Sequence, residues 1–571
     1  MPHRAHLFSL KIGHALSQAC VADPYNGRRF SQDLLAGITV GIIAIPLAMA
    51  LAIASGVPPQ YGLYTAIIGG FVIALTGGSR YSISGPTAAF VVLLFPIAQQ
   101  FGLAGLLLAT VMSGVILVVM ALLRLGRLIQ YIPESITLGF TAGIGVVIAT
   151  LQLKDFFGLD VATMPEHYWD KVATLVAAAP TAHWPSLVVA VVTLAIMLIW
   201  PKLKLPVPAH LPAVIIGSLI GLYLNQHGFA VDTIGSRFSY TLPDGTSGFG
   251  IPAVMPEFAL PWLQPGPDGQ PLTISWSLVQ ALLPSAFAIA MLGAIESLLC
   301  AVVLDGMTNT RHSANSELLG QGFGNIVAPF FGGIPATAAI ARSAANVKAG
   351  GQSPVSAMVH AAVVLLALVA LTGVLAYIPM AAMAALLLVV AWNMSEAPKA
   401  LHLLKTAPSS DILVFLICFL LTVVFDMVIA ISVGIALAAL LFMKEVAEMT
   451  RVREISEDKR YVSEPLPQGT TVLRVEGPLF FAAADNVFGE ISLLSGDAHT
   501  LVLQMDGVTL LDAGGLSALT KLIQRCQERG TRLLISDLQF QPLKTLAKAK
   551  VQPIERVLKF FPTLEEALAE A

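Results

Sequence analysis

The stretch "LLPSAFAIAMLGAIESLLCAVVL" occupies residues 282–304 and contains one charged side chain, Glu296. A helix of about 20 apolar residues crosses the ~30 Å hydrocarbon core of a bilayer, so this stretch is long enough to be a membrane span. A carboxylate at the centre of such a span costs on the order of 2.5–3.5 kcal/mol on insertion scales. The stretch therefore predicts a membrane protein and makes Glu296 a candidate functional residue.

The composition of the whole chain agrees with this interpretation. The 571 residues are 56% hydrophobic and 12% charged, with a mean hydropathy of +0.78, which is typical of a polytopic membrane protein. The net charge of −3 gives no indication of a nucleic-acid partner. The four cysteines have no ligand spacing, so we interpret them as free thiols and expect neither a metal site nor a cofactor. They are Cys20, Cys300, Cys418 and Cys526.

Apolar segments recur along residues 33–446 and predict about fourteen helical spans. Some are too short to cross a full bilayer, and the last two, around Asp426, could instead form a re-entrant pair. We interpret Asp426 as a loop or cap residue. The segments begin near positions 33, 60, 86, 103, 134, 184, 209, 277, 315, 336, 353, 376, 411 and 427.

Positively charged residues predict how these spans are oriented, because cytoplasmic loops carry an excess of Lys and Arg. The N-terminus shows no signal-peptide pattern, and placing it inside leaves Lys154, Lys171 and Arg237 in the outer loops. We therefore expect a multi-pass protein of the bacterial inner membrane with both termini in the cytoplasm. The cations that then lie in or beside cytoplasmic loops are Arg28, Arg29, Arg80, Arg124, Arg127, Lys202, Lys204, Arg311, Lys348, Lys399, Lys405 and Lys444.

Two segments are unlike ordinary spans. In "RYSISGPTAAFVVLLF", residues 80–95, a short alternating stretch precedes Gly-Pro, after which a helix can start at Thr87. In "FGGIPATAAIARSAANVKAGG", residues 331–351, Gly and Pro precede a small-residue helix that contains Arg342. Both contain the similar tetrapeptides Thr-Ala-Ala-Phe, from Thr87, and Thr-Ala-Ala-Ile, from Thr337.

The two broken segments are the third and the tenth of the predicted spans, which fits an inverted repeat of seven plus seven spans. Paired, interrupted spans indicate a transporter's midplane site, and two helix N-termini that meet there favour an anion. Glu296, on the eighth span, would line the same cavity. The alternatives are two re-entrant loops that only pack together, a structural hydrogen bond for Glu296 and a helix-end role for Arg342.

The last part of the chain has the pattern of a separate soluble domain. Residues 451–571 hold 14 of the 32 Lys and Arg residues, and strand and helix patterns alternate, which predicts a mixed sheet covered by helices. We predict four parts: a cytoplasmic segment, 1–32, a transmembrane domain, 33–446, with repeats at about 33–226 and 277–446, a linker, 447–469, and an α/β domain, 470–571.

Several long motifs are similar to those of the SulP family, the sulfate-permease anion transporters. The motifs are "DLLAGITVGIIAIPLAMALAIASGVPPQYGLY", "LTGGSRYSISGPTAA" and "ANSELLGQGFGNIVAPFFGGIPATAAIARSAANVKAGG". The tail resembles the family's cytoplasmic STAS domain. Within the family, residues 285–308 and 382–397 are similar to bacterial aerobic transporters of four-carbon dicarboxylates.

The resemblance implies a core domain that moves against a gate domain, with an anion site between the third and tenth spans. The implied substrate contacts are Thr87, Ala88, Ala338, Ala339, Ala341 and Arg342. In a sodium-dependent bicarbonate branch the Glu296 position is an aspartate, and that branch has Ala-Thr where this chain has Ala339-Ile340. Losing the Thr hydroxyl removes a candidate sodium ligand, so we expect Glu296 to carry the coupling ion, a proton.

The resemblance also bears on the tail. Related anti-sigma-factor antagonists have Asp-Ser-Ser-Gly with a phosphorylated serine, whereas this chain has Asp512-Ala513-Gly514-Gly515, so that form of control is absent. We expect this loop to be a turn with a structural role only, before the following helix. We expect the domain to promote a homodimer or to bind a cytosolic protein.

These observations predict a proton-coupled transporter of dicarboxylates such as succinate, fumarate and aspartate, working by alternating access in the lipid bilayer. Protonation of Glu296 would favour anion binding, and anion binding would favour protonation. The alternatives are a sulfate or bicarbonate transporter of the same family and a membrane-anchored sensor or scaffold acting through the STAS domain. An enzyme is not expected, because no nucleophile–base pair, phosphate loop or metal-ligand spacing is present.

Overall fold

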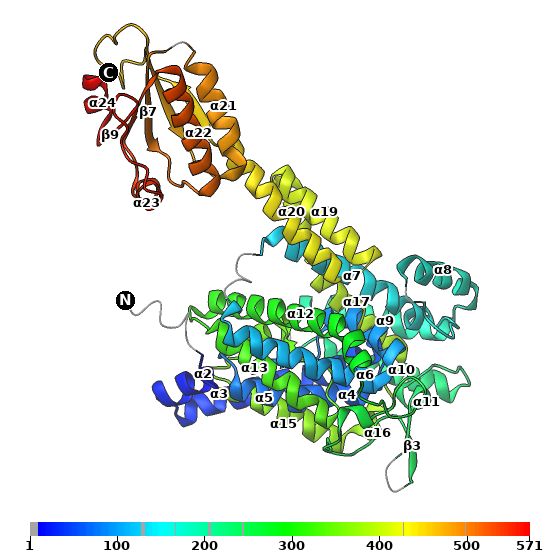
Figure 1. The fold of residues 1–571 in the computed structure, drawn as a ribbon. Coiled ribbons are helices and arrows are strands. Elements are labelled where there is room, and N and C mark those ends of the chain that lie inside the picture. Colours follow the sequence, from blue (N-terminus) through cyan, green and yellow to red (C-terminus); the bar gives the residue numbers. More distant parts are fainter. Residues whose placement is uncertain are drawn as a thin grey trace. The chain divides into compact units, whose positions relative to one another are not determined.

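The computed structural model describes residues 10–126, 132–165, 167–203, 207–241, 245–425, 427–496 and 498–571. Arg127, Lys204 and Asp426, named above, lie outside these ranges. The chain divides into two compact units, residues 1–435 and 436–571. Figure 1 shows the first as a bundle of helices and the second as a sheet with helices.

Within the described residues, each of the fourteen predicted spans corresponds to a helical segment. The second predicted span is a continuous run of three short helices, α4, η3 and α5. The third and fourth predicted spans are both parts of α6, which is divided at Gly102, where φ is 66° and ψ is −170°. The helices of the first half are α3 (Gly27–Ala54), α4 (Pro59–Tyr64), η3 (Thr65–Gly69), α5 (Gly70–Thr76), α6 (Ala88–Leu122), α7 (Glu134–Phe157), α9 (Trp184–Ile199) and α10 (His210–Gln226). Those of the second half are α12 (Trp276–Thr308), α13 (Ala314–Val327), α14 (Ile340–Lys348), α15 (Val355–Ala370), α17 (Met380–Met394), α19 (Ser409–Val424) and α20 (Met427–Glu448).

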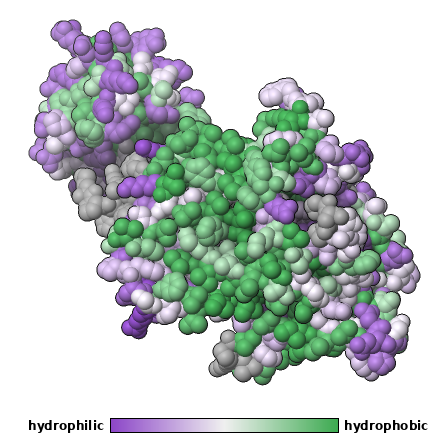
Figure 2. Space-filling model, turned by 90° about the horizontal axis from the view of Figure 1, so that it is seen from below, coloured by the Kyte–Doolittle hydropathy of each residue, from purple (hydrophilic) through white to green (hydrophobic). Residues whose placement is uncertain are grey.

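The apolar surface of this unit is that of a membrane protein. Among the described residues, seven helices are long and apolar enough to cross a membrane, and α15 and α19 are shorter apolar helices. Figure 2 shows broad hydrophobic surface over the helical unit, and many large apolar side chains are exposed on it. Because such surface is unfavourable in water, its natural surroundings are lipid.

The two halves of the chain interlock. Helix α3 packs on α15, α6 packs on both α12 and α13, and α7 packs on both α17 and α19. Small residues allow the close approaches: a Cβ atom on Gly37 of α3 would lie 2.5 Å from the Ser356 carbonyl oxygen at the start of α15. The helices thus form two groups, α3–α6 with α12–α15 and α7–α10 with α17 and α19, as the core and gate arrangement predicts.

Shorter elements connect these helices. The segment between the halves contacts both helix groups. Met380 N–H, at the start of α17, donates to Asp232 O at 2.9 Å, and Ala104 N–H, on α6, donates to Pro265 O at 3.0 Å. The short elements are α2 (His14–Leu16), η2 (Ser17–Ala22), α8 (Tyr168–Ala178), η5 (Ala179–Thr181), η6 (Trp200–Leu203), α11 (Ile234–Arg237), β2 (Ser239–Thr241), β3 (Ser247–Phe249), η7 (Pro261–Leu263), η8 (Ala328–Phe331), α16 (Thr372–Leu375) and α18 (Ala397–Thr406).

The second unit is a five-stranded mixed sheet in the order β5-β6-β7-β8-β9. Strand β5 pairs antiparallel with β6, and the other neighbours are parallel. Strand β5 comes from the segment expected as a linker. The elements are β5 (Arg451–Glu454), β6 (Thr470–Glu476), α21 (Phe481–Leu494), β7 (Thr500–Gly507), α22 (Ala513–Arg529), β8 (Arg532–Ser536), α23 (Phe540–Lys548), β9 (Leu558–Phe561) and α24 (Leu564–Glu570).

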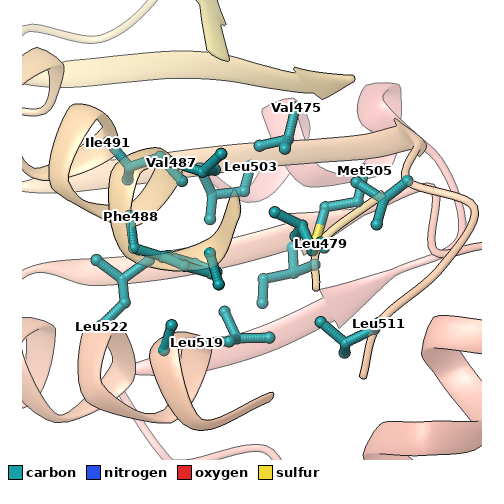
Figure 3. Close-up of a cluster of buried hydrophobic side chains, with 14 of the residues drawn as sticks. Val475, Leu479, Val487, Phe488, Ile491, Leu503, Met505, Leu511, Leu519 and Leu522 are labelled. Atoms are coloured by element: carbon teal, nitrogen blue, oxygen red, sulfur yellow. The ribbon is translucent and has the colours of Figure 1, made fainter. Parts of the chain in front are cut away.

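Alternating strand residues form the two sides of this domain's core. Helices α21 and α22 cover one face, where Leu503 and Phe488 belong to a large buried cluster (Figure 3). Helix α24 covers the other face, against Val502 and Leu534. At the start of α22, the Asp512 side chain accepts from Gly515 N–H at 2.8 Å, so the loop is a turn that caps this helix.

Candidate functional site

The two broken segments meet inside the helical unit as a short antiparallel ladder. Strand β1 (Ser84–Gly85) pairs with β4 (Thr337–Ala338), with Ser84 opposite Ala338 and Gly85 opposite Thr337. Ala339 N–H donates to Ile83 O at 3.0 Å, which extends the contact by one residue. The pairing fixes residues more than 250 positions apart in the sequence at one point of the fold.

Helices α6 and α14 begin directly after this ladder. Their N-cap residues are Thr87 and Ala339, and neither side chain caps its own helix. The first backbone N–H groups of a helix have no intrahelical acceptor and carry the positive end of the helix dipole. Two such starts beside one ladder form a centre that attracts an anion.

Glu296 lies at this centre. It is half-buried on α12, and the Thr87 hydroxyl donates to its Oε2 atom at 2.9 Å. Thr87 therefore connects the start of α6 to the acidic residue instead of capping the helix. The structure thus brings together two of the predicted site residues that are far apart in sequence.

Arg342, on α14, is buried beside the end of strand β1, with 2% of its surface exposed. Its Nη2 atom donates to Pro86 O at 2.5 Å, while Nε and Nη1 have no hydrogen-bond partner among the described residues. Unpaired buried guanidinium donors are costly, and an oxyanion is their natural partner. Arg342 thus holds the β1–α6 junction and keeps donor capacity for a ligand.

The predicted alanines differ in exposure. Ala88 and Ala338 are buried, Ala339 is half-buried, and Ala341 is exposed on the first turn of α14. Their small side chains leave room for a ligand to approach the backbone N–H groups.

The similar tetrapeptides that start at Thr87 and Thr337 do not occupy equivalent places. Helix α6 begins one residue after Thr87, whereas α14 begins three residues after Thr337, which lies in strand β4. The Thr337 hydroxyl instead pairs with Ser297 Oγ at 2.6 Å and contacts Gly293 O at 3.2 Å. The similarity of the two tetrapeptides therefore does not carry over to their positions, because one threonine precedes a helix and the other lies in a strand.

Sequence reasoning missed the polar side chains that support the ladder from α13. Buried Glu317 accepts from the backbone N–H groups of Gly78 and Ser79, both at 2.9 Å. Gln321 donates to Glu317 Oε1 at 2.9 Å and to Ser84 Oγ at 3.2 Å. A signal for them existed: Glu317, Gln321 and Asn325 recur every four residues and so share one helix face.

Asn325 supports the other strand in the same way. Its Nδ2 atom donates to Ala336 O at 2.9 Å, and its Oδ1 atom accepts from Ala336 N–H at 2.8 Å. One face of α13 therefore holds the backbone on both sides of the ladder. Among the described residues no three His, Cys, Asp or Glu side chains gather as a metal-ion group.

Interlocked halves of membrane-spanning helices, with two helix starts that meet at a buried anion-attracting centre, define a membrane transporter of anions. Comparisons with known proteins agree. A model of the sulfate permease family matches residues 30–418, and a model of the STAS domain matches residues 461–567. The chain belongs to the sulfate permease family and carries a STAS domain; it is a transporter, not an enzyme.

Individual relatives support this assignment. "Putative sulfate transporter YvdB" of Bacillus subtilis is 40% identical over 92% of this chain and 94% of its own length. "Bicarbonate transporter BicA" of a Picosynechococcus species is 27% identical over 95% of each chain. The solved transmembrane domain of a cyanobacterial BicA covers 73% of this chain and 98% of its own, with a TM-score of 0.60 and 27% identity.

A structure of murine Slc26a9 in the inward-facing state shares the fold. It covers 98% of this chain and 94% of its own, with a TM-score of 0.82 at 19% identity.

Proposed function

We propose that this protein takes up four-carbon dicarboxylates, such as succinate, fumarate and aspartate, together with protons, by alternating access. One substrate carboxylate would lie on the starts of α6 and α14, at Thr87, Ala88, Ala338, Ala339 and Ala341. The second carboxylate would bind the guanidinium of Arg342, whose Nε and Nη1 atoms are unpaired among the described residues. A substrate with two carboxylates would use both features at once.

The hydrogen bond from Thr87 to Glu296 carries the proton-coupling part of the proposal. It holds a carboxylate at the start of α6, where a substrate carboxylate would also bind. When Glu296 is ionised, like charges repel the substrate; when it is protonated, the repulsion disappears and the carboxyl group can donate a hydrogen bond. Protonation and anion binding then favour each other, which is the energetic coupling that symport needs.

Sulfate or bicarbonate is the second candidate substrate, because the names of the relatives specify these anions. Both are compact oxyanions that could occupy the helix starts alone. A third candidate is a membrane-anchored sensor or scaffold that acts through its STAS domain. We further propose a homodimer in the bacterial inner membrane, with both termini in the cytoplasm and a cytosolic protein as a partner of the STAS domain.

The test is uptake of labelled succinate into proteoliposomes with and without an inward acid gradient, in the wild type and in Glu296→Gln. Glutamine keeps an oxygen for the Thr87 hydroxyl but does not titrate at this site. We expect the gradient to drive accumulation in the wild type, and the variant to exchange succinate without accumulating it. Equal accumulation by both proteins would contradict coupling through Glu296.

Competing anions and binding measurements separate the alternatives. Uptake of sulfate or bicarbonate by a protein that does not move succinate would favour the second candidate. Ligand binding without flux of any of the three anions would favour the sensor.

A further inference from the structure

A cavity of about 230 Å³ lies in the helical unit at positions apart from the β1–β4 ladder. It is lined by Gln18, Arg80, Thr310 and Arg311. These residues come from three parts of the chain: helix η2, the segment that leads into β1, and the turn between α12 and α13. The cavity therefore lies between the N-terminal segment and the residues that lead into β1.

Positive charge predominates at this cavity. Arg80 Nη1 forms an ion pair with Asp23 Oδ2 at 2.8 Å, while Arg311 is exposed and has no ion pair among the described residues. The neighbouring carboxylate of Asp305 is engaged by His312 at 2.8 Å. The lining thus carries two arginines, and one of them, Arg311, has no ion pair among the described residues.

We propose that this cavity binds a phosphate-class oxyanion between Arg80 and Arg311, as a second anion site distinct from the transport site. Guanidinium groups bind phosphate oxygens with paired hydrogen bonds, and they are less strongly hydrated than ammonium groups, so they suit a partly enclosed site. The bound anion would tie the N-terminal segment to the residues before β1. This proposal does not depend on which anion is transported.

Two sources supply this chemistry: free inorganic phosphate and the headgroup of an anionic phospholipid. Both present phosphate oxygens, and an arginine pair at the predicted cytoplasmic end of a membrane protein is accessible to either. The experiment therefore has one arm for each source.

The native thiol of Cys20 offers a readout that is independent of transport. Cys20 lies in η2, two residues from Gln18, and is half-buried, whereas Cys300, Cys418 and Cys526 are buried. The full-length protein is treated with a neutral maleimide, in detergent with and without inorganic phosphate, and in nanodiscs of phosphatidylglycerol or phosphatidylcholine. The rate of Cys20 alkylation is measured by mass spectrometry.

If alkylation proceeds through the anion-free protein, the rate should fall about tenfold at about ten times the dissociation constant. Protection by phosphate in detergent identifies the soluble anion, and protection in phosphatidylglycerol but not phosphatidylcholine identifies the headgroup. Arg311→Gln should remove the protection, while Lys405→Gln, which changes an exposed cation on α18, should keep it. Thr87→Ala should also keep it, because that residue belongs to the transport site.

Three results would overturn the proposal. They are unprotected Cys20 in every arm, full protection in Arg311→Gln, or loss of protection in Lys405→Gln or Thr87→Ala. To exclude misfolding as the cause, Arg311→Gln must match the wild type in thermal stability without added anion.

Discussion

The starts of α6 and α14 both follow the β1–β4 ladder closely, but they carry different side chains. Each helix follows a two-residue strand of one ladder, but the N-cap of α6 is Thr87 and the N-cap of α14 is Ala339. The α6 start is connected to the acidic residue, Glu296, and α14 carries the basic one, Arg342. The two helix starts therefore differ in charge: a carboxylate from α12 is bound at one, and a guanidinium of α14 itself lies at the other. In the proposed mechanism the first serves proton coupling and the second serves anion binding.

The largest expected effect is that of Arg342→Gln. A hydrogen bond to a charged group is worth about 1.5–3 kcal/mol, and each 1.4 kcal/mol is tenfold, so we expect uptake of succinate to fall about ten- to a hundredfold. The measurement is the initial rate of uptake in proteoliposomes. The matched control is Lys348→Gln, which changes an exposed cation on the same helix and should leave the rate unchanged.

If Arg342→Gln lowered the thermal stability of the protein but left the affinity for succinate unchanged, Arg342 would only brace Pro86. The α14 start would then have no part in binding the substrate anion.

The next effect tests the α6 start. Thr87→Ala removes a hydrogen bond worth about 0.5–1.5 kcal/mol, so uptake should fall up to about tenfold and respond less steeply to the acid gradient. Thr87→Ser keeps the hydroxyl and should retain both the rate and the pH profile. A pH profile of Thr87→Ala that matches the wild type would show that the contact with Glu296 has no part in coupling.

Much of the fold was predictable because long apolar segments and interrupted spans have clear physical signatures. Positions 86, 134, 184 and 277 each lie within two residues of an observed helix start. The parts that failed depend on tertiary pairing. Thr337 is followed by two alanines, as Thr87 is, yet only the ladder reveals that Thr337 lies in a strand.

The support from α13 shows a second limit of the sequence. The spacing of Glu317, Gln321 and Asn325 indicates a polar helix face, but not which backbone it holds. Partners such as Gly78 and Ala336 are distant in sequence or carry no distinguishing side chain, so their hydrogen bonds could not be predicted from local pattern.

Glu317→Gln should affect transport less than the two substitutions above, because Glu317 holds only the β1 side of the ladder. Its main effect should be on the stability of the protein. The amide keeps one oxygen, so its NH₂ group faces either the N–H groups of Gly78 and Ser79 or the Nε2 donor of Gln321. Either way a buried donor loses its acceptor, which should cost about 1.5–3 kcal/mol of stability. Thermal unfolding of the purified protein measures this loss. The control Glu445→Gln, at an exposed position of α20, should unfold as the wild type does.

The smallest effect should come from Ile340→Thr, which adds a hydroxyl to the first residue of α14. Sodium prefers hard oxygen ligands, and Glu296 would supply another, so the variant should acquire sodium-stimulated uptake that the wild type lacks. One added hydroxyl is worth as little as about 0.5 kcal/mol, so the stimulation should be about twofold. It is measured by uptake in matched sodium and potassium buffers without an acid gradient. Sodium stimulation of the wild type, with no response to the acid gradient, would instead mean that both helix starts already serve a sodium-coupled site, and the proposal of proton coupling through Glu296 would fail.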